Sequence, residues 1–379
     1  MDCFCSYSTH SDAPSAVALA AADWLLATDG RIPDCLFVFA AGWPLDEVTT
    51  CMQELGRTLR PRVMIGLNCS GAIAAYREME VGPALVLWGM IEPDLEVQTT
   101  HWLGDEIPAN VAGAKVRMVF MDPYSSDCEH LLRLLQQDTG APLVGGLLSG
   151  GSSSREQWLW MNGTLHCGGS LLISMSGPFQ VSTVVAQGCR PIGTPMFVTK
   201  CEGNLLYELN GESPVKVLEQ LYFSLPEKDR LLFRSSLVIG LEMAPFERQH
   251  LSQGDFLIRN VVGVDESKGT LVVGAGMEEA SVVQFHIRDG TTARNDLVQQ
   301  LKAVFQEPPC GLLMITCLGR GTRMYGVPHT DSKLIASQWG RPPMAGFFAN
   351  GEIGPVGGIS YLHGYTACLI GFHPKERLA

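Results

Sequence analysis

The stretch that decides the fold reads CGLLMITCLGRGTRMYG at residues 310–326 and PPMAGFFANGEIGPVGGISYLHGYTACLIG at residues 342–371. Two apolar runs of strand length lead into loops rich in Gly, Arg, Asn and Glu, and a third apolar run closes the segment. Such loops expose backbone N–H groups because little side chain covers them. The pattern predicts strands that end in a small polar pocket, and we recognise no catalytic signature inside it.

The same order of elements is predicted earlier in the chain, with strands at 116–121, 142–146 and 170–175 and a helix at 128–137. Pro-Leu-Val-Gly matches Pro-Met-Ala-Gly, and LHCGGSLLISM matches LHGYTACLIGF, which suggests an internal repeat of about 60 residues. Chance similarity of two βαββ segments is the alternative. Repeated β-α-β units with antiparallel hairpins are typical of mixed sheets covered by helices.

The N-terminal part shows helical periodicity at residues 14–27 and 45–59, and short apolar runs predict strands at 36–40, 63–67 and 84–88. Farther along, residues 179–209 alternate short strands with Gly/Pro turns, a helix is expected at 215–223, and residues 254–290 read as a meander. No low-complexity linker divides the halves. We therefore expect a mixed α/β protein with two packed α/β domains, whose mixed sheets are built from repeated β-α-β-β units.

Composition excludes several classes of protein. The chain has 379 residues, 46% of them apolar and 17% charged, which is typical of a globular protein with well-filled cores. Its formal net charge of −12 disfavours nucleic acid or an anionic membrane as the main partner. No stretch approaches 18 uninterrupted apolar residues, and the first residues lack the basic and apolar regions of a signal peptide.

The 12 cysteines are scattered and form no CxxC pair, so the ligand spacing of a zinc ribbon or finger is missing. Many stand inside apolar runs, where Cys behaves as a small hydrophobic residue. We expect reduced thiols in a cytoplasmic protein, with no metal and no cofactor.

The first candidate ligand-binding residues, Arg288 and Asp289, end a strand in which Gln284, His286 and Arg288 share one face. A planar guanidinium fork matches the two oxygens of a carboxylate ligand. The alternative is a structural Arg–Asp pair or an exposed sheet face.

Three more candidates, Cys317, Arg320 and Gly321, follow the strand at 312–316. Ligands of open α/β sheets bind outside the carboxyl ends of strands, and glycines let the backbone approach a ligand. The sequence GRGTRM does not complete a nucleotide-binding GxGxxG. Cys317 beside two arginines is a candidate reactive thiol, with an inert strand-end thiol as the alternative.

The triplet Asn350-Gly351-Glu352 suits a tight turn, and Glu352 is a candidate partner for a ligand ammonium group or for Arg320. An amino-acid ligand needs a cation and an anion site, which Glu352 with Arg288 or Arg320 would supply. His363 is expected near the same pocket. The alternatives are a turn with a buried structural Glu and a histidine with a structural role.

Several separated blocks resemble the FIST family, which has an N-terminal and a C-terminal domain. The blocks are MIGLNCSGAI, MDPYSSDCEHLL, APLVGGLLSGG, LHCGGSLLISMSGP, GDFLIRNVVGVD, VVQFHIRDGTTARNDL, CLGRGTRMYG and MAGFFANGEIGPVGG. The stretch from Gly188 to Leu218 resembles the junction of the two domains. The resemblance implies a FIST N-terminal domain at 33–234 and a FIST C-terminal domain at 235–374. Residues 1–32, with the helix predicted at 14–27, are then expected to form an N-terminal helical leader.

The resemblance further implies an intracellular sensory protein of signal transduction that binds a small ligand such as an amino acid. We expect a stand-alone member without an F-box or an output domain, whose signal passes to another protein. Two alternatives stay open: a protein-binding adaptor, and a cysteine-dependent enzyme using Cys317 with His363 and Glu352. No nucleophile elbow, HExxH, P-loop or kinase motif occurs, so we expect no catalytic residues.

Overall fold

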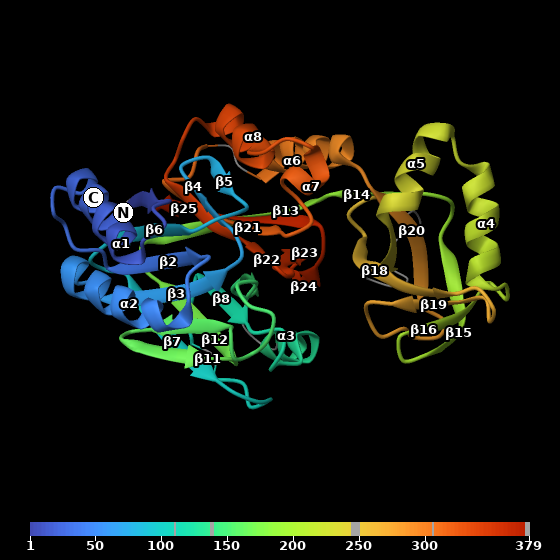
Figure 1. Cartoon of the computed structure of the whole chain (residues 1–379), viewed down its shortest axis with the longest axis horizontal. Coiled ribbons are helices and arrows are strands. Elements are labelled where there is room, and N and C mark those ends of the chain that lie inside the picture. The colour runs from blue at the N-terminus through green and yellow to red at the C-terminus, as the bar shows by residue number, and fades with distance from the viewer. Residues whose placement is uncertain (110, 137–139, 244–250, 305–306, 376–379) are drawn as a thin grey trace. The chain divides into compact units, whose positions relative to one another are not determined.

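The computed structural model describes residues 1–109, 111–136, 140–243, 251–304 and 307–375 (Figure 1). The chain divides into two compact units. Unit 1 comprises residues 1–186, 297–362 and 366–379, and unit 2 comprises residues 187–296 and 363–365. The expectation of a mixed α/β fold is confirmed. Among the described residues, no helix is both long and apolar enough to cross a membrane.

Unit 1 begins with a set of strands that we call repeat A. Its four main strands are β1 (Asp2–Ser8), β2 (Cys35–Ala41), β3 (Val63–Cys69) and β6 (Ala84–Ile91). They lie in the order β1-β6-β2-β3, with β2 parallel to β3 and β6 antiparallel to β2. Helices α1 (Ala13–Ala27) and α2 (Leu45–Leu59) pack on this sheet. Because helices and core cover both faces, β2 and β3 are buried at every position and read as continuous apolar runs.

Repeat B has the same plan. Its main strands are β7 (Glu96–Trp102), β8 (Val116–Met121), β9 (Leu143–Leu147) and β12 (Ser170–Ser176), and its helix is α3 (Cys128–Leu135). The order is β7-β12-β8-β9, again with a parallel pair and an antiparallel return strand. The helix predicted at 128–137 includes Gln137, which lies outside the described residues.

Repeat C repeats the plan a third time, interrupted by the insertion of unit 2 after its first strand. Its main strands are β13 (Phe179–Gln187), β21 (Gly311–Cys317), β22 (Met344–Ala349) and β25 (Thr366–Pro374). They lie in the order β13-β25-β21-β22, with β21 parallel to β22. The helices are α6 (Gly290–Val304), α7 (Thr322–Tyr325) and α8 (Thr330–Trp339).

Each repeat also gives a hairpin to a neighbouring sheet. The hairpins are β4 (Ala72–Ala74) with β5 (Arg77–Met79), β10 (Trp158–Met161) with β11 (Thr164–Cys167), and β23 (Glu352–Val356) with β24 (Ile359–His363). The hairpin of repeat A pairs with β22, that of repeat B with β3, and that of repeat C with β9. The described part of unit 1 therefore holds three six-stranded sheets linked by a cyclic exchange of hairpins.

The main core lies between the inner faces of these sheets and contains residues of all three repeats. Phe347 on β22 contacts Phe39 on β2 and Phe120 on β8, with ring centroids 5.8 and 6.0 Å apart. Outside, α1 and α2 cover the first sheet, α3 the second, and Leu297, Leu301 and Ile335 of α6 and α8 the third. This arrangement directs the turns after β3, β9 and β22 toward one another.

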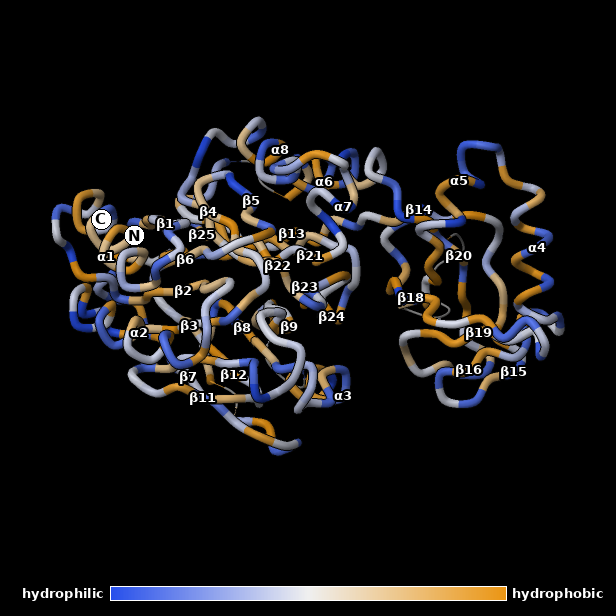
Figure 2. Tube along the Cα trace, viewed as in Figure 1, coloured by the Kyte–Doolittle hydropathy of each residue, from blue (hydrophilic) through white to orange (hydrophobic). Residues whose placement is uncertain are grey.

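Unit 2 is a small antiparallel barrel. Its strands are β14 (Cys189–Pro191), β15 (Met196–Glu202), β16 (Leu205–Leu209), β17 (Leu237–Glu242), β18 (Phe256–Asp265), β19 (Thr270–Val273) and β20 (Val282–Arg288). Pairing of β17 with β20 closes a ring of six of its described strands, and β14 also pairs with β20. Helices α4 (Pro214–Ser224) and α5 (Glu227–Ser236) complete unit 2, and apolar and polar residues alternate along α4 in Figure 2.

The predicted internal repeat is confirmed, since the matching segments form corresponding strands of repeats B and C. The third copy, repeat A, and strand β1 were not predicted from the sequence. The predicted domain boundaries stay a prediction. The compact units follow a different division because unit 2 is inserted between β13 and β21.

Candidate functional site

The second strand of each parallel pair leads into a Ser-Gly or Asn-Gly dipeptide. Ser70-Gly71 follows β3, Ser149-Gly150 follows β9, and Asn350-Gly351 follows β22. The Ser70 N–H donates to Ser149 Oγ at 3.1 Å, and the Ser149 hydroxyl donates to the carbonyl of Phe348. The Phe348 N–H donates to the Gly71 carbonyl at 3.0 Å. The carboxyl ends of the three parallel pairs are thereby joined in one cluster of turns.

A cavity of about 280 Å³ opens beside this cluster, at the carboxyl ends of β2 and β3. Repeat A contributes strand-end residues to its wall, among them Gly42, Trp43 and Asn68. Repeat B contributes Gly150, Arg155 and Glu156, together with Trp158, the first residue of β10. The cavity is thus built between two repeats, on the edge of the sheet where ligands of α/β proteins bind.

Asn68 fixes the repeat B segment to the end of β3. Its Nδ2 donates to the Glu156 carbonyl at 2.8 Å, and its Oδ1 accepts from the Trp158 N–H at 3.2 Å. The side chain is buried, and both ends of its amide are used. Asn68 therefore shapes the cavity wall as a positioning residue.

Two adjacent side chains of opposite charge line the cavity. Among the described residues, the exposed Arg155 guanidinium has no hydrogen bond or ion pair. Glu156 Oε2 accepts from the Ser152 N–H at 2.7 Å and from the Ser152 hydroxyl at 2.8 Å. These hydrogen bonds lower the pKa of Glu156, so its carboxylate is held charged. The site offers a cation and an anion side by side.

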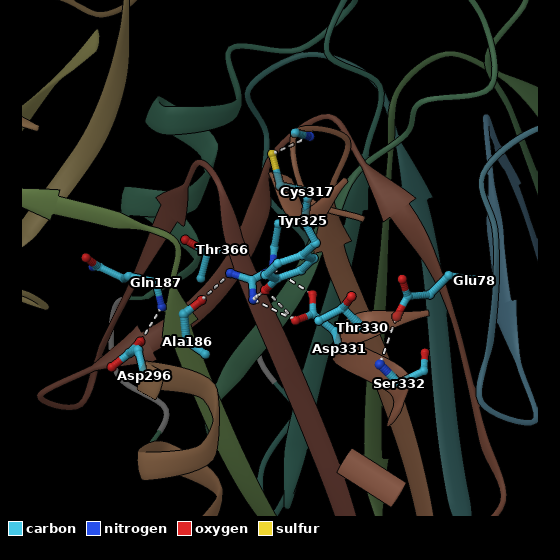
Figure 3. A network of polar contacts seen from close by, with 12 residues as sticks. Glu78, Ala186, Gln187, Asp296, Cys317, Tyr325, Thr330, Asp331, Ser332 and Thr366 are labelled. Atoms are coloured by element: carbon cyan, nitrogen blue, oxygen red, sulfur yellow. Dashed lines mark hydrogen bonds and ion pairs between the residues drawn. The ribbon is translucent and has the colours of Figure 1, made fainter. Parts of the chain in front are cut away.

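The second polar cluster follows β21 and centres on Arg320, which is completely buried. Its Nε and Nη2 donate to the two oxygens of Asp331 at 2.8 and 2.9 Å. Nη2 also donates to the Tyr325 hydroxyl at 2.6 Å, and Nη1 to the Ala186 carbonyl at 3.3 Å. Figure 3 shows Tyr325 and Asp331 converging within this network.

Charge is retained in this cluster despite its burial. Burial disfavours the guanidinium cation, but Asp331 and Tyr325 outweigh burial and hold the pKa of Arg320 above its ordinary value. Burial raises the pKa of Tyr325, which keeps the phenol neutral and able to donate to Asp331 at 2.7 Å. The bidentate pair fixes the loop after β21 against the start of α8.

The comparisons with known proteins agree over the length of the chain. A model of the FIST N domain matches residues 34–212, and a model of the FIST C domain matches residues 214–355. This chain belongs to the FIST family. An uncharacterized protein of Mycobacterium tuberculosis (strain CDC 1551 / Oshkosh) is 33% identical over 377 residues, covering 96% of this chain and 97% of that protein. An uncharacterized protein of Mycobacterium bovis is 30% identical over 375 residues, covering 95% and 96%.

The two FIST models meet inside unit 2, at residues 212 and 214. The FIST N match contains most of repeat A and all of repeat B, and the FIST C match contains part of repeat C. FIST domains are associated with signal transduction and sensory functions. The cavity described above lies wholly within the FIST N match.

The structure brings six of the predicted ligand-binding residues to the strand ends of repeat C. Cys317 ends β21, and its Sγ accepts from the Gly319 N–H at 3.3 Å. Gly321 has a φ of +59°, and a Cβ there would lie 2.6 Å from the Glu80 carboxyl carbon. Arg320 pairs with the Asp331 carboxylate, a partner that was not predicted from the sequence.

The predicted Asn350-Gly351-Glu352 triplet forms the turn from β22 into β23. The Asn350 N–H donates to the Leu147 carbonyl at 3.1 Å, and the Gly351 carbonyl accepts from the Leu147 N–H at 2.9 Å. Glu352 is completely buried, and its Oε2 accepts from the Thr366 N–H at 3.1 Å. The turn of this FIST protein thus ties β22 to β9 of repeat B.

The other three predicted residues belong to unit 2. Arg288 donates to the Ser235 carbonyl at 2.9 Å and lies over the ring of Tyr365, 5.0 Å from its centroid. Asp289 pairs with Arg190 at 3.3 Å and accepts from the Thr291 N–H at the start of α6. His363 is buried. Gln284 and His286 share the face with Arg288 as predicted, and burial lowers the pKa of His286 to about 4.

Three cavity residues were not predicted as candidates from the sequence: Trp43, Arg155 and Glu156. Trp43 follows β2, and its buried Nε1–H has no acceptor among the described residues. The signal available in the sequence was the Ser-Gly that follows the second strand in repeats A and B, matched by Asn-Gly in repeat C. Because the dipeptide recurs, the three strand ends are equivalent. The end of β3 in repeat A is therefore a candidate site as well.

One prediction concerns Glu78, a buried carboxyl that accepts from the Ser332 N–H at 2.8 Å (Figure 3). Burial and the neighbouring Asp331 raise the pKa of Glu78. When the pKa of a carboxyl is higher in the folded than in the unfolded state, stability falls as the pH rises from the unfolded-state pKa, about 4.3 for Glu, to the folded-state pKa. Above the folded-state pKa the loss of stability is constant. We expect Glu78→Gln to remove this fall, which denaturant unfolding between pH 4 and 8 measures.

Glu54→Gln is the control for that series. Glu54 is exposed, and a hydrogen bond from Arg57 lowers its pKa. Glu54→Gln is therefore expected to change the pH dependence of stability only slightly and in the opposite direction. Parallel stability curves for Glu78→Gln and the native protein across this pH range would contradict the prediction.

Proposed function

We propose that this FIST protein is a sensory protein of signal transduction that binds a small polar metabolite of amino-acid size without transforming it. The association of FIST domains with sensory functions supports the general role. The cavity at the ends of β2 and β3 is the proposed binding site. The predicted passage of the signal to another protein is part of the same proposal, and so is the cytoplasmic location.

The single observation that carries the proposal is the pair Arg155 and Glu156 on the wall of a cavity of about 280 Å³. A zwitterionic amino acid presents a carboxylate and an ammonium group a few ångströms apart. The guanidinium fork of Arg155 suits the carboxylate, and Glu156 Oε1, which has no hydrogen bond among the described residues, suits the ammonium. A volume near the lower end of ligand pockets favours a small molecule.

Other cavity residues support a polar ligand with a short side chain. Trp43 offers an apolar ring, and Gly42 and Gly150 leave backbone groups uncovered at the wall. The residues predicted at the ends of β21 and β22 lie on the other strand ends of the same unit. Their direct contact with a ligand stays a prediction, and the burial of Arg320 supports a positioning role for that residue.

Thermal unfolding against a panel of amino acids and common metabolites tests the proposal. A ligand at 100 times its dissociation constant adds about 2.7 kcal/mol of stability. That corresponds to a rise in Tm of a few degrees, since about 2–4 °C per kcal/mol is typical of domains of 150–250 residues. We expect one chemical class to raise Tm, and the ligand to be recovered chemically unchanged by NMR after incubation.

Arg155→Ala is expected to weaken the response to that class at least tenfold in ligand concentration. Arg57→Ala is the charge-matched control, because Arg57 lies twelve residues along α2 from the cavity residue Leu45, roughly 18 Å away. A Tm response that survives Arg155→Ala unchanged contradicts the site. A flat panel at millimolar concentrations contradicts the function and favours a protein-binding adaptor.

A further inference from the structure

Two cysteines far apart in the sequence meet in unit 1. Cys3 lies on β1 of repeat A, and Cys310 directly precedes β21 of repeat C. Their sulfur atoms are 3.7 Å apart, although the residues are separated by 307 positions. A disulfide has an S–S distance of about 2.0 Å, so the two sulfur atoms would have to approach by about 1.7 Å to be joined.

The two thiols are unequal. Cys3 is buried, whereas Cys310 is half-buried and therefore the more accessible of the two. The hydrogen bond between the two thiols lowers the pKa of Cys310 and raises that of Cys3, to which burial also contributes. A more acidic, more accessible thiol beside a buried one is the arrangement of an attacking and a resolving cysteine.

We propose that Cys3 and Cys310 form a reversible disulfide when the protein meets a low-molecular-weight disulfide such as oxidised glutathione. The Cys310 thiolate attacks one sulfur of the oxidant and releases one thiol. Cys3, after losing its proton, then displaces the second small thiol from the mixed disulfide. One S–S bond in the oxidant is broken and one in the protein is formed, and the oxidant leaves as two reduced thiols.

The bond would tie β1, the outermost strand of its sheet, to the start of the central strand β21 in another sheet. Since the cross-link closes a loop of more than 300 residues, it restricts the unfolded chain strongly. The oxidised protein is therefore expected to unfold at a higher denaturant concentration than the reduced protein.

Peptide mapping after oxidation and alkylation tests the proposal. Cleavage after Lys and Arg places Cys3 with Cys5 in residues 1–31, and Cys310 with Cys317 in residues 303–320. The experiment therefore uses the full chain with Cys5→Ser and Cys317→Ser. A cross-link between the two peptides can then join only Cys3 and Cys310. We expect that cross-link to form with oxidised glutathione and to disappear on reduction.

Cys167, which is exposed, reports in the same sample that the oxidant has reacted. The proposal is overturned if Cys167 is modified while Cys3 and Cys310 both remain alkylated, or if Cys310 carries only glutathione. Adding Cys3→Ala removes the resolving thiol, and is expected to leave Cys310 as the mixed disulfide with no rise in the unfolding midpoint. Failure of this test leaves the ligand-binding proposal untouched, because the cavity contains neither cysteine.

Discussion

Replacing Arg320 by methionine is expected to destabilise the protein by about 3–5 kcal/mol, because the substitution leaves the buried Asp331 carboxylate without its ionic partner. Both side chains of this pair are almost completely excluded from water, at 0% and 1% exposure. Methionine fills much of the volume, so the loss is electrostatic rather than a cavity effect. The free energy of unfolding at neutral pH, from denaturant titration, measures the effect.

The double substitution Arg320→Met with Asp331→Leu separates the pair from its surroundings. Replacing both buried charges by apolar groups is often neutral, so we expect the double variant to recover much of the lost stability. Arg57→Met is the exposed control, since Arg57 pairs with Glu54 on the surface and is expected to change stability by less than about 1 kcal/mol. Equal, small losses for Arg320→Met and Arg57→Met would show that the buried pair is not important for folding.

Gly346→Ala is expected to cost at least about 4 kcal/mol and to leave little folded protein, because total stability is commonly only about 5–15 kcal/mol. A Cβ at this position would lie 1.7 Å from the carbonyl oxygen of Met314, its partner on the parallel strand β21. The obstacle is backbone, which a rotamer change cannot relieve. Soluble yield and the unfolding midpoint of the purified variant measure the loss.

Gly145 occupies the corresponding place on β9, with a φ of +147° and a Cβ position 1.9 Å from the Val119 carbonyl oxygen. We expect Gly145→Ala to be equally damaging. Gly56→Ala is the matched control in the same unit, since Gly56 lies within α2 and its Cβ would meet only Met64 Sδ at 3.7 Å. That variant is expected to gain about 0.5–1 kcal/mol. Normal yield and stability of Gly346→Ala would refute the packing argument.

The fold could be predicted from the sequence wherever the signal was local. The helix at residues 45–59 and the strand at 116–121 have the observed bounds, because apolar periodicity reports which side of an element is buried. Strand β1, with the sequence DCFCSYS, was missed because its apolar residues are few and its pairing partner β6 begins about 80 residues later. The similarity of repeats B and C was visible, whereas repeat A shares the topology with little of the sequence.

The candidate site was predicted less completely than the fold. The turns at Cys317–Gly321 and Asn350–Glu352 were found because Gly, Asn and charged residues after an apolar run mark a strand end. Sequence alone did not show that Arg320 is saturated by Asp331 and Tyr325, since that depends on how α8 packs. Arg155 and Glu156 were passed over because they stand in a Ser-rich loop without periodicity.

The sequence by itself determined much of the order of helices and strands, the mixed α/β class and the membership of the FIST family, because each depends on local patterns or on matched segments. Only the tertiary structure decided that three repeats exchange hairpins in a cycle, and that the wall of one cavity joins Trp43 and Asn68 of repeat A to Arg155 of repeat B. The physical reason is that backbone pairing between distant strands uses the N–H and C=O groups that every residue other than proline carries, and therefore leaves little trace in the side-chain pattern.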